Sequence, residues 1–271
     1  MTKASARPSQ LLSARKLARE AIDELRSGWK RYVPIIAIVI VPIDVLALTS
    51  SAAGGDATVS AYSLIVSLAM NVALIWAIVE KERTGVIPRM SSAYYDGSVA
   101  MVRFFLVSAM LVLLLAPAAL GAAIYVAAAT AATNSGASAG ELYLILIPCV
   151  ILILISVHLL VRNGLALIAV VDGQLRPLAA MRYARSLTKS RYWRLAKYYF
   201  SLLVLIILIA IPIALGTTFL AFLKLAPVAT LFFQLATTFT VLPIVNIYLL
   251  RLYHNIESVA AGATNSKEDS A

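Results

Sequence analysis

Six long apolar runs, separated by short polar or basic segments, dominate the pattern along the 271-residue chain. Each run is long enough to cross the hydrocarbon core of a bilayer as a helix, which takes about 20 residues. Strands of a membrane barrel would be about ten residues long and would alternate in polarity, and these runs do neither. The pattern therefore predicts an all-α, polytopic membrane protein. Its six transmembrane helices are expected at residues 33–51, 59–79, 104–130, 142–162, 199–222 and 227–250.

The fourth apolar run extends beyond one span, because it continues from Leu142 to Val171. Counting about 20 residues from Leu142 brings Arg162 to the inner interface, where its long side chain can reach the headgroups. We expect the span to end there, with Gly164 as a kink and Gly173 as a stop. The remaining apolar residues are then expected to bend along the inner surface.

Amphipathic segments precede several of the spans. In residues 10–32, apolar side chains recur at spacings of three and four between basic ones, which predicts an interfacial helix with one apolar stripe. The stripe consists of Leu11, Ala14, Ala18, Ile22, Leu25, Trp29 and Tyr32. In residues 177–190, Ala180, Tyr183, Ala184 and Leu187 share one helical face, and Arg182, Arg185 and Lys189 share the opposite face. Interfacial segments are expected at about residues 81–103 and 165–197. Three inner-surface segments, each followed by two spans, suggest three helical-hairpin repeats.

The predicted membrane domain covers residues 10–255 as a single unit. Residues 1–9 and 256–271 are polar and are expected to be disordered ends. The chain is 61% apolar and only 13% charged, with a net charge of +10, which sets it apart from soluble domains. Lys and Arg gather before the first span and in the second and fourth loops, whereas the alternate loops hold only Lys224. By the positive-inside rule, both termini and the basic loops should be cytoplasmic.

Candidate chemistry inside the membrane is sparse. The sequence contains no P-loop, GxSxG or HExxH motif, so we expect no enzyme, no cofactor and no metal, and a headgroup-modifying enzyme is the least favoured interpretation. Asp44 and Asn71 form a possible intramembrane polar site, because carboxylates within a membrane often mark transport paths. Alternatively, Asp44 faces the bundle or sits near the outer interface, and Asn71 and Asn246 join helices by hydrogen bonds.

Residues 182–199 interleave cations with tyrosines and a tryptophan, a composition that suits either nucleic acid or an anionic lipid surface. Two other basic segments occupy matching positions before spans, which favours anionic headgroups on the inner leaflet and no nucleic acid. The residues expected to contact headgroups are Arg162, Arg182, Arg185, Lys189, Arg191, Trp193 and Arg194.

A family pattern runs through the same region: an arginine, an apolar stretch ending in an acid, and then a basic aromatic helix. The positions that carry it are Arg162, Leu165, Asp172, Pro177, Leu178, Ala180, Leu187, Thr188, Lys189, Trp193, Arg194 and Leu195. The pattern resembles the membrane domain that precedes the catalytic domain in some bacterial glycerophosphoryl diester phosphodiesterases. It also resembles related stand-alone bacterial membrane proteins that share this domain. The resemblance implies a six-helix protein of the bacterial cytoplasmic membrane. It does not imply phosphodiesterase activity, which resides in a separate soluble domain.

Together these features predict a non-enzymatic membrane module that contacts anionic lipid or scaffolds a protein partner. The alternative is a transporter or lipid-translocating protein with a path near Asp44.

Overall fold

The computed structural model describes residues 11–50, 56–135, 139–189 and 191–268, and the regular structure within them is entirely helical. The predicted disordered segment 1–9 lies outside the described residues. The helices of the described part are α1 (Ala14–Ser50), α2 (Asp56–Thr84), α3 (Met90–Leu114), α4 (Ala116–Ser135), α5 (Ala139–Asn163), α6 (Ala166–Asp172), α7 (Pro177–Lys189), α8 (Tyr192–Phe222) and α9 (Ala226–Glu268).

Five helical stretches of the described residues are long and apolar enough to cross a membrane. These are Tyr62–Thr84, Met90–Leu114, Leu146–Asp172, Tyr192–Phe222 and Val228–Ala260. Their number and length confirm the predicted all-α, multi-pass membrane class. A shorter apolar helix covers Ala116–Ala131 in α4, and the predicted first span, 33–51, runs past the described part of α1.

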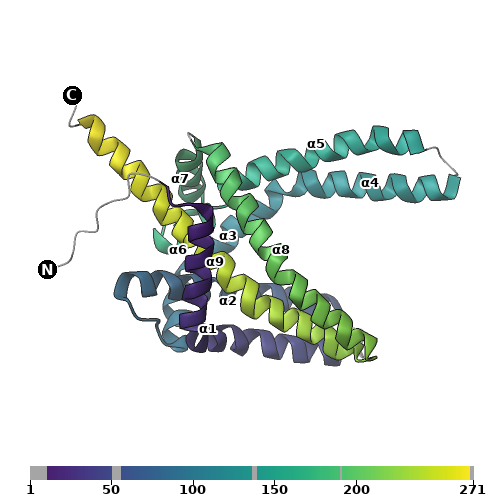
Figure 1. Cartoon of the computed structure of the whole chain (residues 1–271), viewed down its shortest axis with the longest axis horizontal. Helices are drawn as coiled ribbons and strands as arrows, with labels where there is room; N and C mark the ends of the chain where they lie inside the picture. Colours follow the sequence, from purple (N-terminus) through teal and green to yellow (C-terminus); the bar gives the residue numbers. More distant parts are fainter. Residues whose placement is uncertain (1–10, 51–55, 136–138, 190, 269–271) are drawn as a thin grey trace.

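Antiparallel helix pairs give the molecule two arms (Figure 1). The α4–α5 pair forms one arm, and α4 packs mainly against α5. The second arm contains α2, α8, the C-terminal half of α1 and the N-terminal half of α9. Both arms start from the left-hand end in Figure 1, where α3, α6 and α7 and the remaining halves of α1 and α9 are gathered.

Helix α1 bends between an N-terminal half that lies across the left-hand end and a C-terminal half that enters the second arm (Figure 1). Pro34 lies within α1 and removes a helical hydrogen bond, which accounts for a bend in this region. The buried stripe of the N-terminal half includes Leu17, Ala21 and Leu25. The predicted stripe included Trp29, which is 40% exposed, so the helix is rotated relative to the expectation.

Residues 104–130, predicted as one span, are divided between α3 and α4 at Leu115. Pro117 follows the break, where it lacks an N–H for the preceding turn and crowds that turn sterically. Helix α3 begins at Met90, so most of the predicted interfacial segment 81–103 belongs to a long helix packed on α2. Gly97 permits this packing, because a Cβ there would lie 3.3 Å from the Cα of Ala73.

The end of α5 at Asn163 and the end of α6 before Gly173 agree with the expected positions of a kink and a stop. The location of α6 does not agree with the expectation of a surface segment. Its residues Ala166 and Ile168 to Val171 are buried, because α6 packs against α2, α3, α7 and α9. Its residues are apolar on all sides up to Asp172, which suits burial on every face. Gly164 fits the tight corner, since a Cβ there would lie 2.5 Å from the Tyr199 hydroxyl.

Helix α7 begins at Pro177 and is amphipathic in the predicted register. Ala180, Ala184 and Leu187 are buried, while Arg182 and Arg185 are exposed. Helix α9 differs from the prediction, because it continues to Glu268 through residues that were expected to form a disordered tail. Side chains from α7 and from the start of α8 bind this part of α9, as described below.

Candidate functional site: a charge network and a basic corner

The last turn of α2 sends three consecutive charged residues to three different helices. Lys81 Nζ lies 3.1 Å from Glu24 Oε1 of α1, and Glu82 Oε2 lies 2.6 Å from His254 Nδ1 of α9. Arg83 Nη2 lies 2.8 Å from Asp172 Oδ1 of α6. Successive residues point about 100° apart around a helix, so one turn can reach three neighbours. We call these residues and their partners the charge network.

Glu24 and Arg251 form the centre of the charge network on the side of α1. Glu24 is only 6% exposed, and Arg251 Nε donates to its Oε2 at 3.1 Å. Arg251 Nη1 also donates to Glu20 Oε2 at 2.6 Å. The Tyr32 hydroxyl donates to Glu24 Oε1 at 3.3 Å, and burial together with the Glu24 carboxylate raises the pKa of Tyr32 well above its usual range. Glu24 is therefore compensated by two cations and a hydroxyl.

His254 bridges two carboxylates on the other side of the network. Its Nδ1 contacts Glu82 and its Nε2 lies 3.0 Å from Asp172 Oδ2. Ionised carboxylates only accept hydrogen bonds, so this geometry requires a proton on both ring nitrogens, as in the imidazolium. The charged ring then joins α9 to both α2 and α6.

Tyr183 extends the network from α7 to α9. Its hydroxyl donates to Glu257 Oε1 at 2.6 Å. Burial and the neighbouring Glu257 carboxylate raise the pKa of Tyr183 to about 12. Arg191 also donates hydrogen bonds to the Ile256 and Val259 carbonyls of α9. These contacts hold α9 beyond the residue at which its apolar pattern ends.

Asp172, His254 and Glu257 bring one potential metal-ligating atom each within 4.8 Å of one another. Each of them is already engaged, because Arg83 binds Asp172, two carboxylates bind His254 and Tyr183 binds Glu257. A cation would have to displace the ring proton and lie close to a guanidinium. The contacts thus favour a closed set of ion pairs. This cluster is not among the sites predicted from the sequence, although Glu257 lies on the same helical face as His254, three residues later.

A second group of cations surrounds an open pocket where α7 meets α8. The pocket has a volume of about 600 Å³ and is lined by Lys189, Arg191, Tyr192, Trp193 and Arg194, which we call the basic corner. Trp193 is 77% exposed and meets the Tyr192 ring edge-on, with ring centroids 5.5 Å apart. Tyr192 in turn packs against His158 of α5. Lys189 and Arg194 are exposed and form no ion pair within the described residues.

The other cations predicted to contact headgroups differ in their burial and in whether they donate hydrogen bonds within the protein. Arg191 donates from Nη1 to the Ile256 carbonyl at 3.3 Å, and Arg185 Nε donates to Asn163 Oδ1 at 2.8 Å. Arg162 is half-buried at the end of α5, and Arg182 is exposed on α7. Neither forms an ion pair within the part of the chain that the structure describes. Asp172, ten residues after Arg162, is bound by Arg83 and His254.

The two residues of the predicted intramembrane polar site have different surroundings. Asn71 Oδ1 accepts a hydrogen bond from Asn246 Nδ2 at 2.8 Å, which joins α2 to α9. Asp44 is 3% exposed, and both of its carboxylate oxygens lack a hydrogen-bond partner among the described residues. The structure therefore pairs Asn71 with Asn246 and leaves Asp44 as a separate buried carboxylate.

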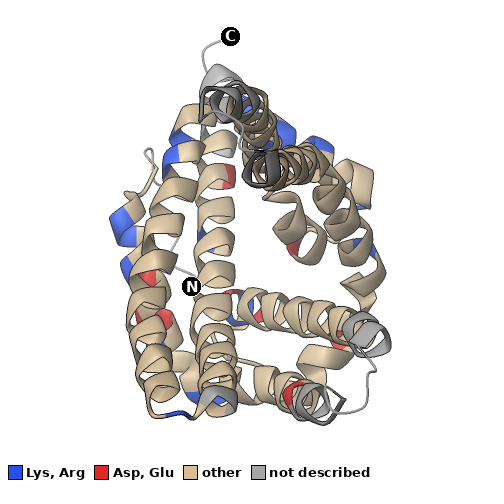
Figure 2. Cartoon of the chain, turned by 90° about the vertical axis from the view of Figure 1, so that its right-hand side faces the viewer, with Lys and Arg blue, Asp and Glu red and all other residues tan. Residues whose placement is uncertain are grey.

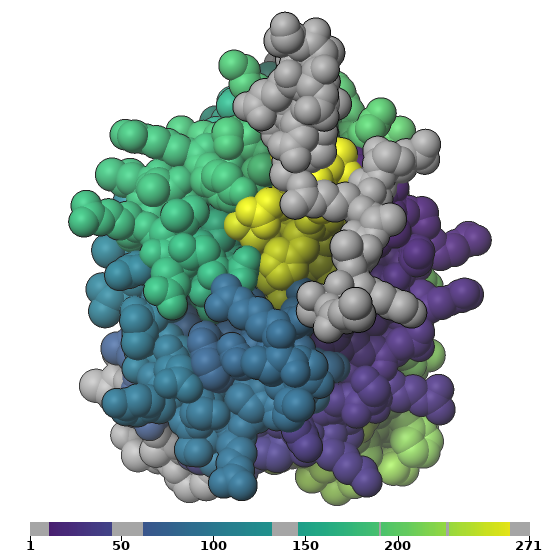
Figure 3. All heavy atoms as spheres, turned by 90° about the vertical axis from the view of Figure 1, so that its left-hand side faces the viewer, coloured from purple at the N-terminus to yellow at the C-terminus, as the bar shows by residue number. Residues whose placement is uncertain are grey.

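Lys and Arg side chains are concentrated at one end of the molecule. Figure 2 colours the Lys and Arg positions along the backbone ribbon. Lys224 lies in the turn between α8 and α9, and Figure 1 shows this turn at the right-hand tip of the second arm. The face in Figure 3, at the opposite end, is covered by α1, the start of α3, α7 and α9. These segments carry most of the described cations.

The five helical stretches that are long and apolar enough to cross a membrane define an integral, multi-pass membrane protein. No protein-family model matches the sequence, and searches of curated proteins and of solved structures find no significant match. The resemblance of residues 162–195 to the phosphodiesterase membrane domain therefore stays a prediction.

Proposed function

We propose that this protein binds anionic phospholipid headgroups on the cytoplasmic side of a bacterial cytoplasmic membrane, without catalysing a reaction. The membrane domain crosses the bilayer six times, through α1, α2, residues 104–130 of α3 and α4, α5, α8 and α9, with both termini inside. The basic corner and the exposed cations of α7 contact the headgroups. The resemblance of residues 162–195 to the phosphodiesterase membrane domain agrees with this layout.

The observation that carries the proposal is the contrast between the two groups of cations. Lys81, Arg83 and Arg251 are neutralised by buried or half-buried acids. Lys189 and Arg194 are exposed beside Trp193 and form no ion pair within the described residues. Tryptophan is favoured at headgroup level, and each basic residue near an anionic surface contributes about 1 kcal/mol. The basic corner thus has the composition of a headgroup site.

Support for the orientation comes from the distribution of charge. Lys224 lies at the far tip of the second arm, whereas the basic corner, α7 and the N-terminal half of α1 lie at the other end (Figure 1). The positive-inside rule assigns the basic end to the cytoplasm.

The proposal is tested by the lipid composition around the purified protein. Wild-type protein equilibrated in mixed micelles of phosphatidylglycerol and phosphatidylcholine should retain phosphatidylglycerol preferentially, as measured by lipid mass spectrometry. The K189Q/R194Q variant should lose most of that preference, while the matched control K224Q should keep it. Equal preference in all three proteins would contradict the proposal, and would leave a protein partner as the better candidate for the basic corner.

Transport is a second candidate function, favoured by the buried carboxylate of Asp44, which has no hydrogen-bond partner among the described residues. Carboxylates inside a membrane are costly and often belong to a substrate or proton path. Proteoliposomes containing a fluorescent phospholipid measure lipid translocation by quenching of the outer leaflet. Translocation by wild-type protein that is lost in D44N would support this function, whereas no translocation above that of empty liposomes would exclude lipid as its substrate.

A further inference from the structure

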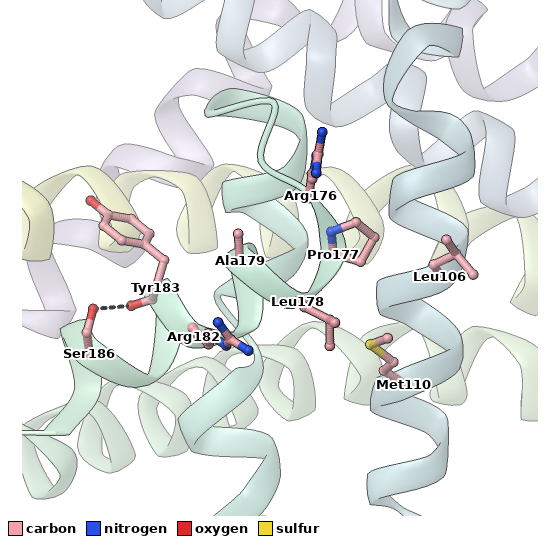
Figure 4. Close-up of a pocket in the computed structure, with 9 residues that line it drawn as sticks. All are labelled: Leu106, Met110, Arg176, Pro177, Leu178, Ala179, Arg182, Tyr183 and Ser186. Atoms are coloured by element: carbon pink, nitrogen blue, oxygen red, sulfur yellow. Dashed lines mark hydrogen bonds between the residues drawn. The ribbon is translucent and has the colours of Figure 1, made fainter.

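An apolar groove lined by two exposed arginines lies between α3 and α7, separate from the pocket of the basic corner. Its volume is about 830 Å³, and its apolar walls include Leu106 and Met110 of α3 and Leu178 of α7. Arg176 and Arg182 line the same groove. In Figure 4, Leu178 points toward Met110, whereas Arg176, just before α7, and Arg182, within α7, lie apart and point in different directions.

The polar groups of the groove differ in whether they are available to a ligand. The Ser186 hydroxyl donates to the Tyr183 carbonyl at 2.7 Å, and the Tyr183 hydroxyl donates to Glu257. Arg176 and Arg182 are exposed and have no acidic partner among the described residues. The nearby acid Asp172 is held by Arg83 and His254. The free polar groups of the groove are thus two guanidinium ions, which bind phosphate with directed hydrogen bonds.

The apolar part of the groove continues onto a surface suited to acyl chains. Beyond Leu106 and Met110, Val112 and Leu113 of α3 are 68% and 72% exposed. Helix α3 is one of the stretches that can cross a membrane, so its exposed apolar side chains are suited to lipid. A ligand that fits both parts carries an anionic phosphate next to a long hydrocarbon chain.

We infer that the groove between α3 and α7 is a binding site for one anionic phospholipid. An acyl chain lies along Leu106, Met110 and Leu178, and the long, exposed side chains of Arg176 and Arg182 turn toward the headgroup to bind its phosphate. This inference rests on the proposed function and names a defined site for it, distinct from the headgroup contacts of the basic corner. Arg176 is a residue that the sequence analysis did not place among the lipid contacts.

Native mass spectrometry of the detergent-solubilised protein with added phosphatidylglycerol tests the inference. Wild-type protein should show an adduct with one lipid that persists when the free lipid is diluted. R176Q/R182Q should weaken this adduct by about tenfold or more, given two lost charge contacts. M110W, which fills the groove without changing its charge, should weaken it as well. Each variant is checked by thermal unfolding so that loss of fold is recognised.

The control variant K189Q/R194Q separates the inference from the proposed function. It should keep the one-lipid adduct while it loses the wider preference for phosphatidylglycerol in mixed micelles. An adduct of equal strength in wild type, R176Q/R182Q and M110W would overturn the groove site, whatever the basic corner does. Complete displacement of the lipid by millimolar inorganic phosphate would overturn it too, because the occupant would then be a soluble anion.

Discussion

Arg251 of α9 donates hydrogen bonds to the carboxylate of Glu24 in α1, across 227 positions of the chain. Both side chains lie at the end of the molecule where α1 bends and α9 leaves the second arm. The pair therefore joins the first and last helices of the described structure. Because Glu24 is almost fully buried, its free energy depends on its partners more strongly than that of a surface acid.

Replacing Arg251 by Met should destabilise the protein by about 3–5 kcal/mol, because it leaves a buried carboxylate with Lys81 as its remaining cation. Thermal and denaturant unfolding in a fixed detergent measures the change. E20Q is the matched control, since Glu20 is more exposed and should cost about 1 kcal/mol or less. Equal losses for R251M and E20Q would show that burial of Glu24 does not determine the effect.

Gly164→Ala should destabilise the α5–α6 corner by about 1–3 kcal/mol, as is typical of overpacking, because the new Cβ would lie 2.5 Å from the Tyr199 hydroxyl. Tyr199→Phe removes that oxygen, which is buried without a hydrogen-bond partner among the described residues. Y199F alone should therefore be neutral or stabilising, and the double variant should recover much of the stability lost in G164A. A double-mutant cycle with no coupling would contradict the contact.

His254→Gln should loosen the C-terminal part of α9, because a neutral amide cannot replace an imidazolium between two carboxylates. Hydrogen–deuterium exchange should increase in residues 250–260, while α8 keeps its protection. The same experiment on H158Q serves as a control, since His158 contacts an aromatic ring and no acid is bonded to it among the described residues. Unchanged exchange in H254Q would argue against the bridge.

The six-span topology predicts opposite accessibility for two exposed positions. In a C149S background, S186C should react with a membrane-impermeant maleimide only after the cells are permeabilised. K224C should react in intact cells, because it lies in a turn at the other end. Labelling of both positions from the same side would contradict the proposed topology.

The all-α membrane class could be predicted from the sequence because the length of an apolar run is a strong signal for a transmembrane helix. The sequence contains no comparable signal for the partners of buried charged residues. Gly164 indicates where α5 ends, and α7 shows its amphipathic face directly, whereas residues 104–130 were predicted as one span despite Pro117. The burial of α6 could not be deduced, since an all-apolar segment suits lipid and protein interior equally. The buried face of α1 could not be deduced either, because Arg251, which binds Glu20 and Glu24 on that helix, is distant from them in sequence. Arg176 escaped notice because only the groove beside α3 distinguishes it from other cations.

The three charged residues that end α2 also have a consequence for biosynthesis. Lys81, Glu82 and Arg83 emerge from the ribosome before α6 and α9, which supply the partners of Glu82 and Arg83. Glu24 must likewise wait for Arg251. An incomplete chain therefore carries uncompensated charges at the membrane surface until its last helix arrives. Such a nascent protein should be distinguishable to quality-control proteases from one whose synthesis is finished.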